Sequence, residues 1–437
     1  MRVLLLAVGS HGDVHPAVAI ARALIARGHE PRVAANPYFE RVVTDAGAGF
    51  EPLGERFDLG EAIRSTNIMT GPLAPFRLFR RFVVPTIDPS ADELTKLINR
   101  LAPDGVVNHP LSVAGPPVCE ALGVPWISTA LAPISWWNPA DLPLFSALDR
   151  THPPRLLSRA GVFIARSVCR LMLDGPINRL RKRLGLRPGR DLFVSQTTGG
   201  GLSLGLWSRH FREPLASDPP GGVTCGFPVF DDLRDYERDR GEIESFLAAG
   251  DAPIVFTLGT AGVHAAGRFY EAAAKACSLV DRRGILLTGR PEYAPRSVPR
   301  RVAVFPAASF SRLFPRCRAV VHHGGIGTIA QALRAGRPQL VTPMSHDQFD
   351  NSARVKRLGA GQRLEHARVN AERLAPLLLD LETPGHTGRA AELGSRIRAE
   401  DGATSAAIAI EDFLSSLAPY RHAEKVRRGD SERSRRR

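Results

Sequence analysis

The stretch from Arg318 to Gly361 constrains the fold of this chain more than any other part of the sequence. A short apolar run, Ala319–Val321, is typical of a buried strand, and two histidines and the glycine-rich segment Gly324–Thr328 follow it directly. Apolar residues then recur at helical spacing until a glycine and a proline end the pattern. The sequence therefore predicts a strand, a tight turn and a helix, and then a second strand over Gln339–Val341.

The turn in this stretch has the chemistry of an anion-binding site. A helix N-terminus carries unpaired backbone N–H groups and the positive end of the helix dipole, and glycines let an anion approach the backbone closely. His323 and Thr328 add an imidazole and a hydroxyl that can donate to the same anion, and Gln331 follows within reach of a sugar hydroxyl. A turn packed for its own sake would explain the glycines alone, but not these side chains and the downstream Asp-Gln pair.

The same stretch resembles the donor-binding signature of family-1 glycosyltransferases, the nucleotide-sugar enzymes of the GT-B fold. The segments HHGGIGTIAQAL, AGRPQLVTP and DQFDN carry the resemblance. It implies that the turn holds the donor diphosphate through His323, Gly325, Gly327 and Thr328. It also implies that Asp347 and Gln348 hydrogen-bond the donor sugar. Gln331 stands where many members of the family have an acidic ribose ligand.

The rest of the chain alternates between strand and helix patterns. Val3–Val8 is apolar, Pro16–Arg27 has one apolar helical face, and Glu30–Ala35 can form a second strand. Apolar runs such as Ile254–Leu258 and Ile285–Thr288 begin a second series in the C-terminal half. This alternation is typical of parallel, doubly wound sheets. The predicted fold class is α/β: two Rossmann-like domains facing each other across a cleft, as in the GT-B fold.

A chain of 437 residues is long enough for two or three domains, and its composition suggests where they divide. Residues 213–222, EPLASDPPGG, are the clearest linker because they are dense in proline and glycine. They separate an acceptor-binding domain, residues 1–212, from a nucleotide-sugar donor-binding domain, residues 223–402. We expect a last helix over 403–417 and a disordered basic tail over 418–437.

The turn after the first strand, GSHGDVHP, resembles the same segment of bacterial lipid and natural-product glycosyltransferases. Asp13 occupies the position where plant relatives place a catalytic histidine. His109 falls near the position of the aspartate that orients this histidine. The resemblance therefore implies a catalytic pair with exchanged residue types, in which Asp13 deprotonates the acceptor. His11 and His15 are the alternative bases and otherwise belong to the rim of the acceptor site.

Two apolar segments are candidates for contact with a hydrophobic acceptor. The loop APISWWNPADLPLF is expected at the carboxyl ends of the strands, where ligands bind in doubly wound folds. Trp136, Trp137 and Phe145 are therefore candidate walls of an acceptor pocket, with core packing as the alternative. The segment Leu73–Pro85 interleaves apolar residues with three arginines. It is either a surface helix or a lip that meets a membrane or the acceptor.

The remaining donor contacts come from segments before the glycine-rich turn. Thr260 follows a predicted strand and can assist His323 at the leaving diphosphate. Ser309 and Phe310 lie where the family packs the nucleobase. Fixed hydrogen-bond donors can stabilise the leaving group electrostatically, and no Asp-x-Asp pair follows a strand to hold a divalent cation. We therefore expect no metal and no cofactor, with a UDP- or dTDP-sugar as co-substrate.

The composition is unusual in its net charge, which is +14. The segment from Arg421 to Arg437 has eight Lys or Arg against three Asp or Glu, and we interpret the remaining excess as spread along the chain. No nucleic-acid-binding motif accompanies the charge, so nucleic acid is not expected as a partner. No apolar run approaches the ~18 residues that span a membrane. The protein is expected in the cytoplasm, with peripheral contact at the inner membrane face as an alternative.

Together these features predict an inverting, metal-independent glycosyltransferase. It would move a hexose from a nucleotide sugar to a hydroxyl of a lipid or a hydrophobic small molecule. The motifs most resemble those of the bacterial rhamnosyl- and sterol-type branch, and inversion follows from the family and from a single base without an opposing nucleophile. The alternatives are a nucleotide-sugar 2-epimerase of the same fold and an inactive nucleotide-sugar-binding partner protein. The tryptophan-rich loop argues against the first, and Asp13 with a complete donor motif argues against the second.

Overall fold

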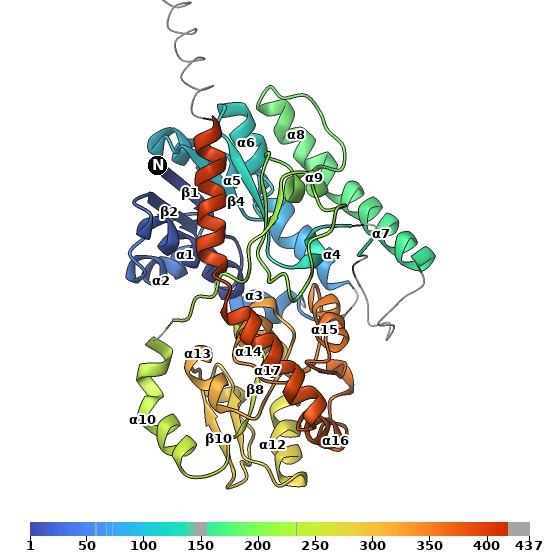
Figure 1. The fold of residues 1–437 in the computed structure, drawn as a ribbon. Coiled ribbons are helices and arrows are strands. Elements are labelled where there is room, and N and C mark those ends of the chain that lie inside the picture. The colour runs from blue at the N-terminus through green and yellow to red at the C-terminus, as the bar shows by residue number, and fades with distance from the viewer. Residues whose placement is uncertain are drawn as a thin grey trace, which may run out of the picture.

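The computed structural model describes residues 1–417 apart from 57–58, 67, 72, 139, 142, 144–154 and 233. Within these residues the chain forms two parallel β-sheets, one in each half (Figure 1). The N-terminal sheet has the order β3-β2-β1-β4-β5-β6-β7, and the C-terminal sheet has the order β10-β9-β8-β11-β12-β13. Each order reverses direction beside the first strand of its half. This is the doubly wound topology, and it confirms the predicted fold class.

The strands of the N-terminal sheet are β1 (Arg2–Leu6), β2 (Glu30–Ala35), β3 (Gly49–Pro52), β4 (Gly105–Asn108), β5 (Trp126–Ala130), β6 (Ser203–Gly205) and β7 (Gly222–Thr224). The strands of the C-terminal sheet are β8 (Ile254–Thr257), β9 (Gly284–Leu287), β10 (Val302–Phe305), β11 (Ala319–His322), β12 (Gln339–Val341) and β13 (Gly361–Arg363). They are short and mostly buried, as expected when helices cover both faces of a parallel sheet.

The helices of the N-terminal half are α1 (His11–Ala26), η1 (Pro37–Phe39), α2 (Glu40–Asp45), α3 (Leu59–Thr66), α4 (Ala74–Leu78), η2 (Phe79–Val83), α5 (Val84–Leu101), α6 (Gly115–Leu122), η3 (Pro133–Ser135), α7 (Arg155–Cys169), η4 (Arg170–Asp174), α8 (Gly175–Arg183) and α9 (Leu192–Thr198). Those of the C-terminal half are α10 (Arg234–Ala248), α11 (Gly259–Gly262), η5 (Val263–Ala265), α12 (Phe269–Leu279), η6 (Pro291–Tyr293), α13 (Phe310–Leu313), η7 (Phe314–Arg316), α14 (Ile326–Arg334), α15 (Gln348–Arg357), η8 (His366–Arg368), α16 (Ala371–Leu381) and α17 (Pro384–Arg398). No helix in this described part is long and apolar enough to cross a membrane.

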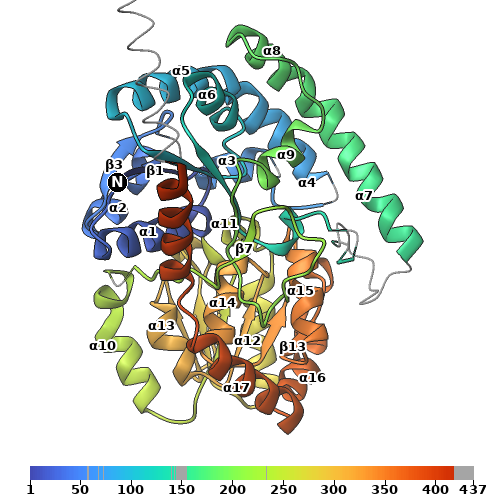
Figure 2. The same ribbon diagram turned by 45° about the horizontal axis from the view of Figure 1, so that its top comes forward.

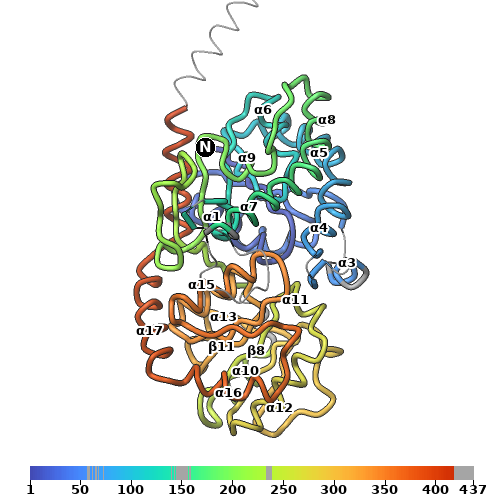
Figure 3. Tube along the Cα trace, turned by 90° about the vertical axis from the view of Figure 1, so that its right-hand side faces the viewer, coloured from blue at the N-terminus to red at the C-terminus, as the bar shows by residue number. Residues whose placement is uncertain are grey.

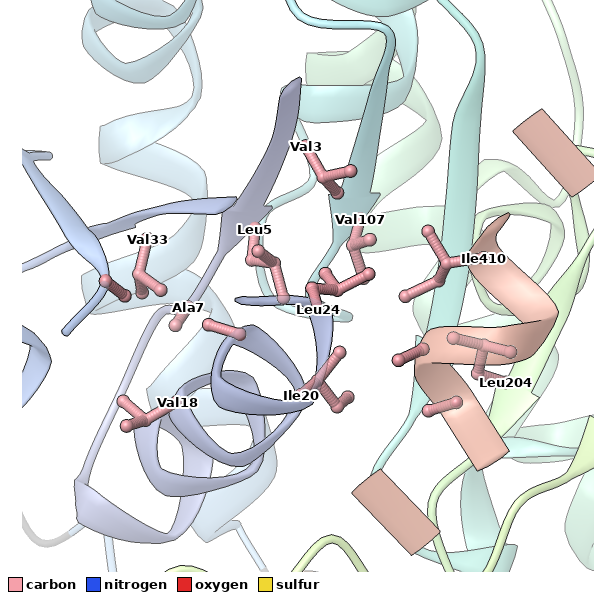
Figure 4. Packing of buried hydrophobic residues seen from close by; sticks show 14 of the residues in the cluster. Val3, Leu5, Ala7, Val18, Ile20, Leu24, Val33, Val107, Leu204 and Ile410 are labelled. Carbon is pink, nitrogen blue, oxygen red and sulfur yellow. The ribbon is translucent and has the colours of Figure 1, made fainter. Parts of the chain in front are cut away.

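A last helix, residues 402–417, returns to the N-terminal half (Figure 3). Its apolar residue Ile410 packs in one cluster with Leu5 of β1, Leu24 of α1 and Val107 of β4 (Figure 4). A side chain at Gly105 would overlap Leu414 of this helix, so the glycine lets the helix approach the sheet. The two halves are therefore tied by the end of the chain as well as by the segment between the sheets.

The division between the halves lies later than the predicted linker. β7 pairs with β6 in the N-terminal sheet, so the proline-rich segment 213–222 belongs to the first half. Asp218 holds this segment in place because it pairs with Arg212 and accepts from the backbone N–H of Leu215 at 2.9 Å. Proline and glycine content alone predicts a linker, whereas this ion pair orders the segment against the domain. The crossing therefore comes after Thr224.

Candidate active site

The first group of candidate residues lies at the carboxyl ends of β1 and β4. Asp13 is in the first turn of α1, which follows β1, and His109 comes directly after β4. The two strands are neighbours, with Leu5 paired to Val107, so the two side chains meet. Nε2 of His109 lies 3.4 Å from Oδ1 of Asp13. The structure thus brings together the two residues that the sequence proposed as a pair.

Hydrogen bonds orient both side chains. Oδ2 of Asp13 accepts from the backbone N–H of Ser10 at 2.7 Å and from its hydroxyl at 2.9 Å. Nδ1 of His109 accepts from the backbone N–H of Leu111 at 3.1 Å, which leaves a ring proton on Nε2, facing the carboxylate. The Nε2–Oδ1 contact is not aligned as a hydrogen bond, so it acts as a short-range electrostatic contact.

The surroundings of Asp13 keep its carboxylate ionised. Burial on its own would raise the pKa of Asp13, but His109 and the two Ser10 donors outweigh this effect and hold the pKa below its ordinary value. Asp13 is also the more accessible partner, with 25% of its side chain exposed against 3% for His109. Asp13 is therefore the group that can meet a substrate. His109 lies behind it, and both residues line a small cavity together with Thr129.

The second group surrounds the N-terminus of α14. Gly325 is the N-cap, and no side chain caps the helix, so its first N–H groups have no side-chain acceptor. His323 precedes the turn and is buried, and its Nδ1 has no hydrogen-bond partner among the described residues. Burial, together with the neighbouring His322 and His366, lowers the pKa of His323 to about 3. The ring is therefore neutral and can offer one N–H to an anion.

Glycines make room for the imidazole of His323. A Cβ at Gly259 would lie 2.7 Å from Cε1 of the ring, and a Cβ at Gly325 would lie 2.6 Å from Nε2. Gly259 also has a φ of +66°, a conformation that residues with a side chain rarely adopt. In contrast, nothing lies within 4 Å of the place that a Cβ would take at Gly327. This face of the turn is open space that a ligand can occupy.

The adjacent histidine, His322, has a structural role. Its Nε2 lies 2.8 Å from Oε1 of Gln339, and its Nδ1 accepts from the backbone N–H of Gly324 at 3.1 Å. Burial lowers the pKa of His322 to about 4, so this ring is also neutral. Neighbouring residues of an extended segment point to opposite sides, which is why the two histidines have different surroundings.

The third group is the loop before α15. Burial raises the pKa of Asp347 to about 7, and the negative charges of Asp13 and Asp350 add to this increase. A hydrogen bond that Asn351 donates at 2.7 Å lowers the pKa but does not outweigh burial. The charge of Asp13 thus reaches Asp347, so these two carboxylates, one from each half of the chain, lie near each other. Oε1 of Gln348 accepts from the backbone N–H of Met344 at 2.8 Å and so holds the loop.

Sequence reasoning assigned no role to His346, which precedes Asp347. It has a φ of +55°, which is uncommon for a residue other than glycine. Its Nε2 lies 2.8 Å from the carbonyl oxygen of Ile68, in the opposite half. The loop is thus anchored across the two halves. The partner is a backbone carbonyl, so no pattern of side chains in the sequence could have revealed this contact.

A buried ion-pair network forms a second tie between the halves. Nη1 of Arg354, on α15, lies 2.9 Å from Oδ2 of Asp141, and Nε of Arg212 lies 3.0 Å from the same oxygen. Arg354 also pairs with Asp350 at 2.7 Å, one helical turn back. Burial would raise the pKa of Asp141, but Arg354 and Arg212 hold it below its ordinary value. Asp141 belongs to the tryptophan-rich loop, which is therefore fixed to the helix that begins beside Asp347.

The other predicted donor contacts are spread around the α14 turn. Thr328 and Gln331 are buried on α14, and Thr260 is exposed on α11. The hydroxyl of Ser309 donates to Asp231 at 2.6 Å, and the same carboxylate oxygen accepts from the backbone N–H of Ser311 at 2.7 Å, so Asp231 holds the start of α13. Phe310, the next residue, is half-buried and stacks on Phe314 with 4.4 Å between ring centroids. Their contacts with a nucleobase or diphosphate remain predictions.

The predicted acceptor residues fall into two sets. His11 and His15 lie on α1 beside Asp13, with edge contacts to Phe39 and Phe230 at 5.0 and 5.2 Å between ring centroids. Each lies two residues from Asp13 on α1, so their rings point to a different side of the helix from its carboxylate. Their place at the rim of an acceptor site stays a prediction.

The tryptophans of the loop occupy different places. Trp136 is 1% exposed, packs edge-on against Trp207 and donates to the hydroxyl of Ser203 at 3.1 Å. It belongs to a core between the halves that also contains Ile329 of α14, so in this structure it is a packing residue and not a pocket wall. Trp137 is half-buried, and Phe145 lies outside the described residues.

The fold and the candidate site are typical of one class of enzyme: two doubly wound domains, with a candidate base in one half and a candidate anion-binding turn in the other. Residues 3–133 match the family model described as glycosyltransferase family 28 N-terminal domain. Residues 283–412 match the model described as erythromycin biosynthesis protein CIII-like, C-terminal domain.

Curated relatives extend this match along the chain. The chain is 33% identical over 429 residues to the O-mycaminosyltylonolide 6-deoxyallosyltransferase of Streptomyces fradiae, over 94% of this chain and 97% of that protein. It is 29% identical over 379 residues to a sterol 3-beta-glucosyltransferase of Arabidopsis thaliana, over 83% of this chain but 57% of that protein. The chain belongs to the family-1-like glycosyltransferases of the GT-B fold, and it is a glycosyltransferase.

Solved structures show the same architecture. The glycotransferase of kitacinnamycin superposes with a TM-score of 0.70 at 21% identity, over 94% of this chain and 99% of that one. The spinosyn forosaminyltransferase SpnP superposes with a TM-score of 0.69 at 20% identity, over 95% and 99%. The family predicted from the donor motif and the predicted fold are both confirmed. Membership of this family leaves the epimerase and the inactive partner without support.

Proposed function

We propose that this glycosyltransferase moves a hexose, with inversion, from a UDP- or dTDP-sugar to a hydroxyl of a lipid or a hydrophobic small molecule. The carrying observation is that Asp13 of one half lies close enough to Asp347 of the other to act on it electrostatically. Asn351 also links Asp347, at 2.7 Å, to the carbonyl oxygen of Gly324, at 3.0 Å, just before the uncapped N-terminus of α14. The names of two relatives, a 6-deoxyallosyltransferase and a sterol glucosyltransferase, support a sugar donor and such an acceptor. A structural neighbour solved with dTDP supports a nucleotide at this fold.

Asp13 is the proposed general base. Its low pKa makes it ionised but weakly basic, so it takes the acceptor proton late, once the acceptor oxygen has begun to bond to the anomeric carbon. As that bond forms, the bond from the anomeric carbon to the diphosphate breaks, and its electron pair leaves with the nucleoside diphosphate. His109 positions the carboxylate from behind and has no contact with the sugar in this scheme.

The α14 turn is the proposed site for the leaving diphosphate. The N–H groups of the first helical turn, the hydroxyl of Thr328 and the neutral ring of His323 are donors that are already in place before the reaction. They stabilise the new negative charge without a metal ion or cofactor. Asp347 and Gln348, at the start of α15, are the proposed ligands of the sugar hydroxyls, and we propose a cytoplasmic location for the reaction.

Ligand-induced stabilisation tests this proposal. The full chain is heated with a panel of UDP- and dTDP-sugars, and a ligand at a hundredfold excess over its Kd should stabilise the fold by roughly 2.7 kcal/mol. We expect a shift with one class of donor that is lost in His323→Ala. Nucleotide release is then measured with hydrophobic alcohols as acceptors. A folded sample that no sugar nucleotide stabilises would contradict the proposal.

A further inference from the structure

The positive charge of this chain is concentrated in one segment as well as in the tail. Residues 155–190 contain ten Lys or Arg against one Asp, a net of +9 out of the +14 of the whole chain. The expectation of an evenly spread excess is therefore wrong. This segment forms α7, η4 and α8, which follow one another without a break, and Figure 2 shows them in line along one edge of the N-terminal half.

The first part of this helical segment exposes large apolar side chains. The exposed fractions are 79% for Leu156, 68% for Phe163, 61% for Ile164 and 87% for Leu171. Leu156 and Leu171 are each seven or eight residues, about two helical turns, from Phe163 and Ile164, which places all four on one side of the helix. None of the described side chains of α7 is buried, whereas Leu173 of η4 and Ile177 and Leu180 of α8 are. The α7 end thus keeps its apolar face away from the core.

Ion pairs hold the helix in this position. Nη2 of Arg166 lies 3.1 Å from Oδ2 of Asp191, and Nη2 of Arg170 donates to the same oxygen at 2.6 Å. These contacts fix the middle of the segment to the start of α9. Five further cationic side chains are exposed and have no acidic partner among the described residues: Arg159, Arg179, Lys182, Arg187 and Arg190.

We propose that α7 and η4 form a docking surface for an anionic lipid bilayer. An apolar helix face enters the boundary between headgroups and acyl chains, and flanking cations attract the anionic headgroups. The charge favours a bilayer over a protein partner, because these five cations are spread from Arg159 to Arg190 and none has an acidic partner among the described residues.

Two exposed apolar residues, Leu73 just before α4 and Phe76 on it, precede η2. Phe79 of η2 contacts Phe193 of α9 at 5.0 Å between ring centroids. Leu73 and Phe76 belong to the predicted lip, Leu73–Pro85, which therefore extends the proposed docking surface.

Vesicle sedimentation of the full chain tests this surface without any donor, so its outcome is separate from that of glycosyl transfer. We expect binding to phosphatidylcholine vesicles that contain phosphatidylglycerol, weaker binding to phosphatidylcholine alone, and a decrease at high salt. Replacing both Phe163→Ser and Leu171→Ser should lower the partition coefficient about tenfold or more. The side chains are exposed, so the melting temperature should not change.

A matched control carries Leu279→Ser and Leu379→Ser, which are 54% and 46% exposed on α12 and α16 of the other half. This variant should bind vesicles as the natural chain does. Equal binding of all three proteins would overturn the proposal, because the tail or the overall charge would then hold the vesicle. Absence of vesicle binding, or a self-association that disappears in the Phe163/Leu171 variant, would also overturn it.

Discussion

The proposed donor side and the proposed acceptor side of this enzyme are built on the same kind of sheet, yet they present their side chains differently. On the donor side, His323, Thr328 and Gln348 are buried and come from two consecutive strand–helix units. On the acceptor side, α4 and α7 expose apolar residues, and two π-helical turns, η2 and η4, interrupt the helices.

This contrast follows from the ligands that we propose for each side. A diphosphate has one geometry, so fixed donors at one turn can serve it, and such a turn has a recognisable sequence. A hydrophobic acceptor is bound mainly through the apolar surface that it buries, and many different arrangements of apolar side chains can provide such a surface. The Asp13–His109 pair lies where the two sides meet. Substitutions on the donor side should therefore change the affinity for the donor. Substitutions on the acceptor side should change turnover or binding to lipid.

The largest effect is expected at Asp13. Asp13→Asn removes the proposed base but keeps an oxygen that can accept from Ser10, so the fold should be intact. Turnover should fall by about 10²–10⁴, the usual contribution of general base catalysis. Thermal stabilisation by the donor should match that of the natural chain, because the donor contacts lie in the other half. Turnover within tenfold of the natural enzyme would assign the base elsewhere.

The next largest effect is expected on stability, and it tests whether the buried ion pairs between the two halves stabilise the fold. Arg354→Leu leaves Asp141 and Asp350 without their shared partner, and breaking a buried ion pair costs about 3–5 kcal/mol. Unfolding by urea can be followed by tryptophan fluorescence, since Trp136 lies in the core between the halves.

Arg396→Leu is the control for this change. Arg396 pairs with Glu392 on the surface, where an ion pair contributes about 0–1 kcal/mol. Equal losses in the two variants would mean that the Asp141 network has no special part in joining the halves.

A smaller effect is expected in the pH dependence of stability. The pKa of Asp347 is about 7 in the fold, above its ordinary value of 3.8, so the folded state keeps a proton that the unfolded chain loses. The contribution to stability is complete below 3.8 and is lost as the pH rises through 7. Asp347→Asn should therefore be the more stable protein above pH 7, by on the order of 1 kcal/mol per pKa unit, while binding the donor less well.

Thermal melting across this pH window checks the prediction. The difference between Asp347→Asn and the natural chain should shrink as the pH falls toward 4. A difference that grows in acid would mean that Asp347 is an ordinary, ionised carboxylate in the fold.

Much of the donor side could be predicted from the sequence because its elements are local. The expected strand Ala319–Val321 is part of β11, and the expected helix after the glycines is α14. The meeting of Asp13 and His109 follows from neighbouring strands, so the family comparison could anticipate it.

Long-range contacts could not be predicted in the same way. The burial of Trp136 depends on Trp207 and on α14 of the other half, and no feature of its own loop distinguishes a packed tryptophan from an exposed one. The interaction of His346 with Ile68 crosses between the halves. The concentration of charge over residues 155–190 was visible in the sequence, but its meaning depends on the exposed face of α7.

The most direct measurement compares donor affinity in Gly327→Ala and Gly388→Ala. Both glycines lie in helices with no atom within 4 Å of the added Cβ, so neither change should destabilise the fold, and each can add up to about 1 kcal/mol. If the diphosphate sits on the α14 turn, Gly327→Ala should bind the sugar nucleotide at least about tenfold more weakly in calorimetry, because the methyl group occupies its place. Gly388→Ala, on α17, should bind as the natural chain does. Unchanged affinity in Gly327→Ala would contradict the proposed donor site.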